Sequence, residues 1–256
     1  RDQPRSRGLG DVYKRQDYSS LRLVQWAFNM IIKLAGIELT VIGEENISEG
    51  PVLYIGNHRS FFDIVITYAR CKNLTGYIAK KEMLSIPLLR TWMKRLYCLF
   101  LDRENPKEGL KTILQAIDYV KHGISICIFP EGQLTRTGTL CAARRGLEML
   151  AKKSRCPIVP IYMDELWGSI FSYSGNRFFS KAPLHVPYRF TAAIGEPIAP
   201  DAVNPRIVIN TLRELSSTCL EIAASIGRDT ILNHLERIAH KPVSYTHLTL
   251  PTILRV

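Results

Sequence analysis

His58 and Asp63 are the residues whose types and spacing most directly indicate chemistry in this sequence. His58 follows an apolar run, Val52–Ile55, and a Gly-Asn corner, and Asp63 lies five positions later. If a helix begins near Ser60, one turn brings the carboxylate back toward the imidazole. A carboxylate that holds a neutral imidazole fixes its tautomer, and the ring can then act as a general base. The alternative is an ordinary N-capping corner beside a surface aspartate.

Two further polar loops are expected near this corner. Strands alternate with helices, which predicts an α/β fold with a mixed, largely parallel sheet covered by helices, and sites in such sheets form where strands end. Asp102-Arg103 follows one predicted strand, and Glu131–Arg136 follows the unbroken apolar run Ile124–Phe129. Gly132 lets a backbone approach a ligand closely, and arginine and backbone N–H groups suit phosphate oxygens. The loops together predict a histidine base beside a phosphate-binding rim, although each loop alone could be an ordinary solvated loop.

The elements that must position these loops follow from the apolar periodicity. We predict strands over 38–41, 51–55, 76–79, 96–101, 124–129, 157–162 and 190–194. We predict helices over 61–69, 107–122, 142–153, 206–226 and 230–239, and a helix broken at Pro87 within 83–94. The buried face of the helix over 107–122 is expected to consist of Leu110, Ile113, Leu114, Ile117 and Val120.

The segment Leu21–Ile37 is strongly apolar but carries Arg22 and Lys33, so it is too short between charges to span a bilayer. Its polar residues recur every three or four positions, as one narrow stripe on a helix: Arg22, Gln25, Asn29 and Lys33. The remaining faces are apolar, with Leu23, Trp26, Phe28, Met30 and Ile31. Such a helix can lie in a membrane interface with the polar stripe toward water. The alternative is a core helix packed against the domain.

Composition limits the class of partner. The formal net charge of the 256 residues is +11, which favours an anionic partner such as nucleic acid, phosphate esters or an anionic membrane. No nucleic-acid-binding module is recognisable. The six cysteines are scattered without C-x-x-C or zinc-finger spacing, so we expect reduced, buried thiols in a cytosolic compartment. The sequence also has no G-x-S-x-G elbow, Walker A loop, H-E-x-x-H or Rossmann glycine set.

The two ends differ from the rest of the chain. We expect residues 1–16 to be non-native or disordered, residues 17–240 to form the functional domain, with 17–37 as its interfacial helix, and residues 241–256 to be a non-native tail. The chain can then be a fragment of a longer protein.

Four ordered blocks resemble the glycerophospholipid acyltransferases of the 1-acylglycerol-3-phosphate acyltransferase type. The first is N-H-x4-D, with Asn57, His58 and Asp63; the second is a lysine-rich segment, a proline and a strand ending in D-R. The third is F-P-E-G, from Phe129 to Gly132, and the fourth is an apolar strand with an internal proline, Val159-Pro160-Ile161. Gln133-Leu134 stands where family members commonly have Thr-Arg, so the arginine role falls to Arg136. The variant blocks look most like the 2-acylglycerophosphoethanolamine acyltransferase domain of fused acyl-carrier-protein synthetases.

The resemblance implies direct transfer of a fatty acyl group from acyl-CoA or acyl-carrier protein to the free hydroxyl of a lysophospholipid. His58 would be the base and Asp63 its orienting partner, and no metal or other cofactor is implied. The implied substrate-binding residues are Asn57, Lys80, Arg103, Glu131, Gly132, Thr135 and Arg136. The expected location is the cytoplasmic face of the inner membrane, as a peripheral or monotopic protein on an anionic surface, with no nucleic-acid partner.

Two other functions remain open from the sequence. A non-catalytic module could use Leu21–Ile37 and the basic surface to bind anionic lipid. A thioesterase-like hydrolase could use the same base on water. The oxyanion donor, the acceptor head group and the oligomeric state are not indicated by the sequence.

Overall fold

The structure is a computed structural model, which describes residues 5–140, 146–173 and 188–226. Its strands form one seven-stranded sheet in the order β1-β7-β6-β2-β5-β3-β4. Their bounds are β1 Glu38–Ile42, β2 Leu53–Gly56, β3 Thr75–Lys80, β4 Leu99–Leu101, β5 Ser125–Ile128, β6 Ile158–Met163 and β7 Arg189–Ile194. All neighbouring strands pair in parallel except β6 and β7. This confirms the predicted mixed, largely parallel α/β sheet.

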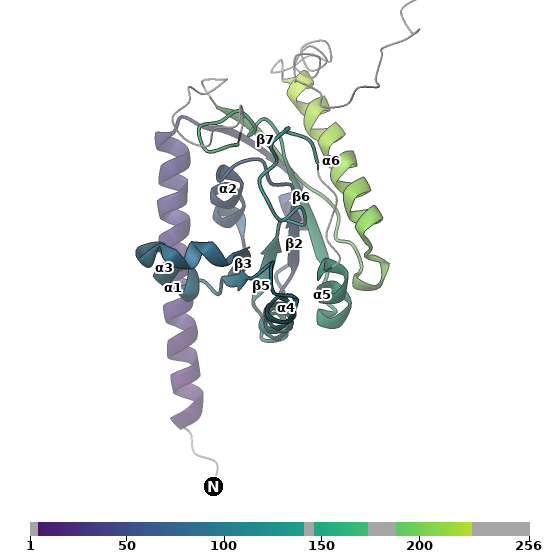
Figure 1. The fold of residues 1–256 in the computed structure, drawn as a ribbon. Helices are drawn as coiled ribbons and strands as arrows, with labels where there is room; N and C mark the ends of the chain where they lie inside the picture. Colours follow the sequence, from purple (N-terminus) through teal and green to yellow (C-terminus); the bar gives the residue numbers. More distant parts are fainter. Residues whose placement is uncertain (1–4, 141–145, 174–187, 227–256) are drawn as a thin grey trace, which may run out of the picture.

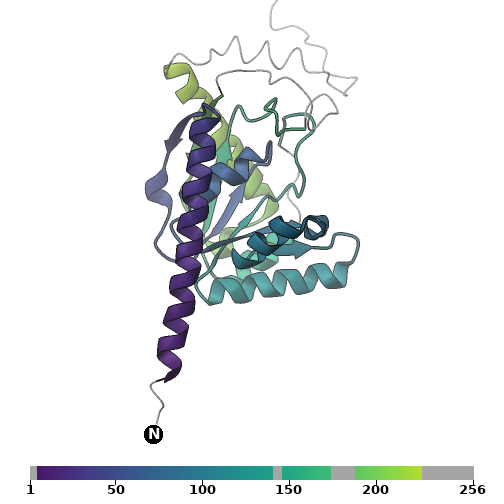
Figure 2. The same ribbon diagram turned by 90° about the vertical axis from the view of Figure 1, so that its left-hand side faces the viewer.

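Helices cover both faces of the sheet, as Figure 1 shows. On one face lie α1 (Arg5–Leu34) and α2 (Phe62–Arg70), which pack against each other. On the other face lie α4 (Pro106–Lys121), α5 (Gly146–Ser154) and α6 (Pro205–Ser225). Figure 2 faces α1 and shows it crossing in front of the sheet. Alternate residues along the buried strands enter the two cores, so Tyr54 packs with α2 while Leu53 and Ile55 pack with the opposite layer.

The sheet topology brings the carboxyl ends of five strands to one edge. Strands β4, β3, β5, β2 and β6 are neighbours in this order and run parallel. The loops that follow β2, β4 and β5 carry His58, Asp102-Arg103 and Glu131, and Lys80 is the last residue of β3. The fold therefore places the predicted loops along one side of the sheet.

The segment that precedes β4 is not part of the strand, contrary to our prediction of a strand from Leu96. After α3 (Pro87–Arg95), the Cys98 N–H donates to the carbonyl of Met93 at 2.9 Å, and Tyr97 has a φ of 57°. The α-helix thus ends through a residue in the left-handed conformation, and this turn occupies the three residues before β4. Gly76 makes room for it, because a Cβ there would lie 2.1 Å from the Tyr97 carbonyl oxygen. The predicted break at Pro87 is confirmed, with a 3-10 turn over Lys81–Ser85 before it.

The predicted buried face of α4 is partly wrong. Leu110 and Leu114 are 47% and 46% exposed, while the buried residues are Ile113, Ala116, Ile117 and Val120. The buried positions recur at i, i+3, i+4 and i+7 around Ala116, which the prediction left out. The buried face of α4 is therefore centred near Ala116, and Leu110 and Leu114 lie outside it.

Helix α1 has one packed face and one exposed apolar face. Leu21 is buried, and Phe28 makes an edge contact with Tyr68 of α2 at 5.7 Å between ring centroids. Gln25 donates to the carbonyls of Tyr68 and Cys71 at 3.2 and 2.8 Å, so its predicted place in a water-facing polar stripe is wrong. The exposed apolar side chains between residues 21 and 34 of this helix are Leu23, Trp26, Met30, Ile31 and Leu34. None of the helices described has the length and apolar character needed to cross a bilayer.

Several sequence predictions fall outside the described residues. These are the helix over 230–239, the first part of the helix over 142–153, and the tail over 241–256. The helix α1 includes Arg5–Gln16, a stretch that we left out of the sequence-based fold.

Candidate active site

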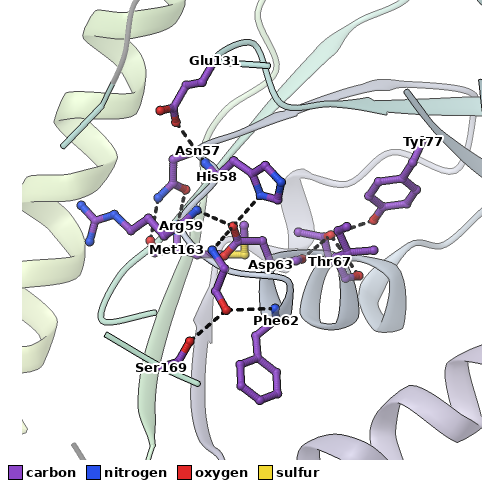
Figure 3. Close-up of polar contacts among 12 residues, drawn as sticks. Asn57, His58, Arg59, Phe62, Asp63, Thr67, Tyr77, Glu131, Met163 and Ser169 are labelled. Atoms are coloured by element: carbon purple, nitrogen blue, oxygen red, sulfur yellow. Dashed lines mark hydrogen bonds and ion pairs between the residues drawn. The ribbon is translucent and has the colours of Figure 1, made fainter. Parts of the chain in front are cut away.

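The Asn57–Asp63 corner brings the predicted base and its carboxylate together. His58 follows β2, and Asp63 lies in the first turn of α2. His58 Nδ1 is 2.9 Å from Asp63 Oδ2 (Figure 3). The His58 side chain is 12% exposed and the Asp63 side chain is fully buried. One helical turn thus returns the carboxylate to the ring, as the spacing predicts.

The hydrogen bonds of Asp63 assign the tautomer of His58. Asp63 Oδ2 accepts from the backbone N–H of Arg59 at 2.6 Å and of Ser60 at 2.9 Å. An oxygen that accepts these two N–H groups has no proton of its own to donate to the ring, so the ring is the donor and its proton is on Nδ1. Nε2 keeps its lone pair and makes no hydrogen bond within the described part of the chain. The ring is therefore arranged to accept a proton at Nε2.

The loop after β5 holds His58 from a second side. The Phe129 ring stacks on the imidazole with centroids 4.1 Å apart and planes 9° from parallel. Glu131 is buried and accepts the His58 N–H at 3.0 Å, and the Thr135 N–H donates to the His58 carbonyl at 2.9 Å. Gly132 has a φ of 73°, in the left-handed region that favours glycine, where the loop turns back. The F-P-E-G block thus contacts the N-H-x4-D block directly.

Two of the predicted substrate-binding residues make side-chain hydrogen bonds within the protein. Asn57 is buried, and its amide donates to the Met163 carbonyl and accepts the Met163 N–H, both at 2.8 Å. Buried Thr135 donates to the Thr139 carbonyl at 2.9 Å and accepts the Gly138 N–H at 3.1 Å. Glu131 likewise uses one carboxylate oxygen on the His58 backbone. These contacts hold the corner and its neighbouring loop.

The predicted phosphate-binding cations, called the rim cations below, are exposed side chains at or after the ends of β3, β4 and β5. Lys80 at the end of β3 and Arg103 after β4 are exposed, and Arg136 lies over the Tyr173 ring at 4.9 Å. Asp102 binds Lys81 at 2.8 Å, and this hydrogen bond lowers the pKa of Asp102 and raises that of Lys81. Asp102 also accepts the N–H groups of Glu104 and Asn105. The aspartate of the D-R pair therefore shapes the loop, and the arginine is left at the surface.

The sequence reasoning missed Arg59 and its partners on β6. Arg59 Nη1 is 2.5 Å from Asp164 Oδ1, and its Nη2 donates to the Tyr162 hydroxyl. Burial raises the pKa of Tyr162 to about 12. Ser60 Oγ is 2.9 Å from Ser169 Oγ. A signal was present, because Asp164 lies two residues after the predicted buried strand over 157–162, close to a strand end as the other site loops are.

The cysteines in the described part of the chain are free thiols. In the described ranges, five are free thiols, of which four are buried: Cys71, Cys127, Cys156 and Cys219; Cys98 is half-buried. Cys141 lies outside these ranges. Among the residues that the structure describes, no group of three His, Cys, Asp or Glu side chains could hold a metal ion.

The chain is similar to known acyltransferases. The Acyltransferase family model matches residues 38–164, which include β1 to β6 and the whole corner. The chain is 29% identical over 206 residues to a 1-acyl-sn-glycerol-3-phosphate acyltransferase of Borreliella burgdorferi, which covers 80% of this chain and 74% of that protein. A probable enzyme of this name from Mycoplasma pneumoniae is 24% identical over 200 residues, covering 74% of each chain.

A plant relative and a solved structure extend the comparison. The 1-acyl-sn-glycerol-3-phosphate acyltransferase of Cocos nucifera is 34% identical over 167 residues, and the match spans about half, 51%, of its length. The crystal structure of the 1-acyl-sn-glycerophosphate acyltransferase PlsC from Thermotoga maritima has the same fold, with a TM-score of 0.63 at 20% identity over 82% of this chain and 80% of that one. Over residues 38–164 the chain thus matches the Acyltransferase family, and these relatives are named as O-acyltransferases of the 1-acylglycerol-3-phosphate type.

Proposed function

We propose that this protein transfers a fatty acyl group from a thioester to the free hydroxyl of 1-acylglycerol-3-phosphate at a membrane surface. The observation that carries the proposal is the orientation of His58, whose Nδ1 is bound to buried Asp63 while Nε2 has no hydrogen-bond partner among the described residues. A binding module has no use for such a base. The names of the relatives supply the acceptor class.

The chemical step follows from that orientation. Nε2 of His58 takes the proton of the acceptor hydroxyl as its oxygen attacks the thioester carbonyl. The tetrahedral intermediate then expels the thiol sulfur, which takes the proton back from Nε2. Asp63 stabilises the charge that the ring carries between the two transfers. A positioned general base of this kind typically contributes ~10²–10⁴-fold to the rate.

The rim cations are proposed to hold the acceptor phosphate. Lys80, Arg103 and Arg136 follow or flank the strand ends around His58. Arginine pairs with phosphate through two parallel N–H bonds, and lysine acts as a point charge. Holding the phosphate would orient the hydroxyl at near-contact distance from the carbonyl carbon, which lowers the entropic part of the barrier.

The membrane part of the proposal rests on exposed apolar helix faces. Leu23, Trp26 and Leu34 on α1, and Leu88 on α3, are each more than half exposed. Apolar side chains grouped on a helix surface suit the headgroup and acyl boundary of a bilayer, where both the acceptor and the acyl product reside. The excess positive charge would add attraction to anionic lipid.

An acceptor panel tests the proposal. The protein is incubated with lysophosphatidate, lysophosphatidylethanolamine or no acceptor, each with acyl-CoA or acyl-carrier protein, and the products are read by mass. We expect diacyl product from lysophosphatidate and little free fatty acid. Product from lysophosphatidylethanolamine alone would replace the proposed acceptor with the ethanolamine lipid, and acceptor-independent thioester cleavage would indicate a hydrolase.

A further inference from the structure

The position of the Asp63 carboxylate depends on the peptide backbone of Arg59 and Ser60. Their N–H groups donate to the same carboxylate oxygen that accepts the His58 Nδ1 proton. The contact with the Arg59 amide is the shorter of the two, at 2.6 Å. Whatever holds the Arg59 backbone in place therefore also holds the carboxylate against the imidazole.

The Arg59 side chain provides such a hold. It points away from the imidazole ring, as Figure 3 shows, and reaches the end of β6, the strand beside β2. There it binds Asp164 and the Tyr162 hydroxyl, and its guanidinium carbon lies 5.1 Å from the Tyr162 ring centroid. The Arg59 and Asp164 side chains are only 14% and 11% exposed. Separating the two charges of a pair this deeply buried is costly, because each would be left in the protein interior without a partner. The pair therefore holds the Arg59 side chain in one place.

The guanidinium charge of Arg59 is paired with the Asp164 carboxylate. Burial acts to lower the pKa of Arg59, but Tyr162, Asp164 and Asp63 together raise it above its ordinary value. A substrate phosphate would have to displace Asp164 to bind this guanidinium. The geometry thus separates Arg59 from the rim cations, which are exposed.

The same part of the chain holds the rest of the corner. Met163 binds both ends of the Asn57 amide, the Ser169 hydroxyl binds Ser60, and the Phe171 carbonyl accepts the Phe61 N–H at 3.2 Å. All of these partners lie between Tyr162 and Ser172. Arg59 supplies the charged contact of this set.

We infer that Arg59 is a positioning residue of the acyl-transfer reaction. Its guanidinium, bound to Asp164 and Tyr162 at the end of β6, fixes the peptide whose N–H holds Asp63 against His58. The inference rests on the proposed function for its kinetic effect, but the positioning itself can be observed without any substrate.

The test separates positioning from stability by removing both charges. Arg59→Met alone leaves Asp164 buried without a partner and can fail to fold. The double variant Arg59→Met, Asp164→Leu has no lone buried charge, so we expect its melting temperature to recover toward that of the wild type. We expect kcat to stay about 10- to 100-fold low, because a displacement of about 1 Å at the reacting groups costs this much. KM for lysophosphatidate should change by less than about threefold, because Arg59 does not touch the acceptor.

The matched controls are Arg59→Lys and Arg189→Met. A lysine can still reach Asp164 but cannot bind two acceptors at once, so we expect a kcat between those of the wild type and the double variant. Arg189 pairs with Glu38 at 2.9 Å across β7 and β1, and both side chains are about half exposed, so its replacement should leave kcat unchanged.

A substrate-free measurement completes the test. The low-field proton resonance of His58 Nδ1–H, assigned by its loss in His58→Gln, should shift or broaden in the double variant and persist in Arg189→Met. If the double variant regains wild-type kcat together with its stability, or keeps the resonance unchanged, Arg59 has only a structural role and the inference is overturned. If the wild type acylates no lysophospholipid, the proposed function fails, while the resonance still decides whether Arg59 positions the pair.

Discussion

At the scale of single residues, the site depends on how the two ring nitrogens of His58 are used. Asp63 Oδ2 accepts two backbone N–H groups in addition to Nδ1–H, so its position is set by the corner itself. The five-residue spacing of His58 and Asp63 was sufficient to predict their contact, because helix geometry alone brings the two together. The roles of Asn57 and Thr135 were harder to predict, since a polar side chain at a strand end looks the same whether it binds a ligand or the backbone.

Asp63→Asn tests the orienting role of the carboxylate. The amide has the same shape, but it can place an NH2 donor where the carboxylate oxygen accepted the Nδ1 proton. The imidazole ring then loses its fixed tautomer. We expect kcat to fall by about 10²–10⁴-fold with the melting temperature changed much less. The control is Asp118→Asn, because Asp118 forms an exposed pair with His122 on α4, at 3.4 Å. A loss of activity in both variants alike would contradict the assignment.

The buried thiols predict how stability depends on pH. Burial raises the pKa of both Cys71 and Cys219 to about 12. In the unfolded chain these thiols ionise near their ordinary pKa of about 8.5, so the unfolded state gains stability as the pH rises above that value. The free energy of unfolding should be insensitive to these groups below about pH 8 and fall between about pH 8.5 and 12.

Urea unfolding at pH 8 and pH 10.5 measures this dependence. We expect a loss of about 1–3 kcal/mol for each of the two thiols at the higher pH. Cys219→Ala should show a smaller pH dependence than the wild type, whatever its stability at pH 8. A free energy of unfolding that is equal at the two pH values would show that the thiols ionise alike in both states.

At the scale of elements, the periodicity predicted most helices and strands to within a few residues, and the exceptions have physical causes. The strand at β4 begins late because the chain first closes α3 with Tyr97 in a left-handed conformation. Such an ending leaves little trace in the sequence, because Tyr is rarely found at positive φ. The face of α4 was misplaced because Ala116, a small residue, marks the centre of the buried face.

A pair of substitutions on α4 measures which face is buried. Ile117 is buried against the sheet, whereas Leu114, three residues before it, is almost half exposed. Ile117→Ala should lower the free energy of unfolding by about 2–4 kcal/mol, because it leaves a cavity in the core. Leu114→Ala should cost less than about 1 kcal/mol. Equal losses in urea unfolding would place Leu114 in the core, as the sequence suggested.

The exposed apolar face of α1 is expected to contact the membrane. Leu23 on α1 and Leu114 on α4 are similarly exposed, at 52% and 46%, so they form a matched pair. Leu23→Glu should weaken co-sedimentation with anionic phospholipid vesicles several-fold, because a carboxylate in the apolar face opposes both burial and the lipid charge. Leu114→Glu should bind as the wild type does. Equal binding by the two variants would remove α1 from the membrane contact.

At the scale of the whole molecule, the parallel sheet explains how blocks that are far apart in sequence reach one edge. His58, Lys80, Asp102-Arg103 and Glu131 end or follow four strands whose carboxyl ends meet at this edge. This edge could be predicted from the alternation of strands and helices. The support from β6 could not, because the order of strands places β6 beside β2, and neither periodicity nor spacing determines that order.

Turnover of the His58→Ala variant tests directly whether His58 is the base of the acyl transfer. The assay follows acyl transfer from a thioester to lysophosphatidate, with His122→Ala as the control, since His122 is an exposed histidine with its own aspartate neighbour. We expect a fall of at least about 10²-fold for His58→Ala and none for His122→Ala. Wild-type turnover by a folded His58→Ala variant would contradict this role of His58.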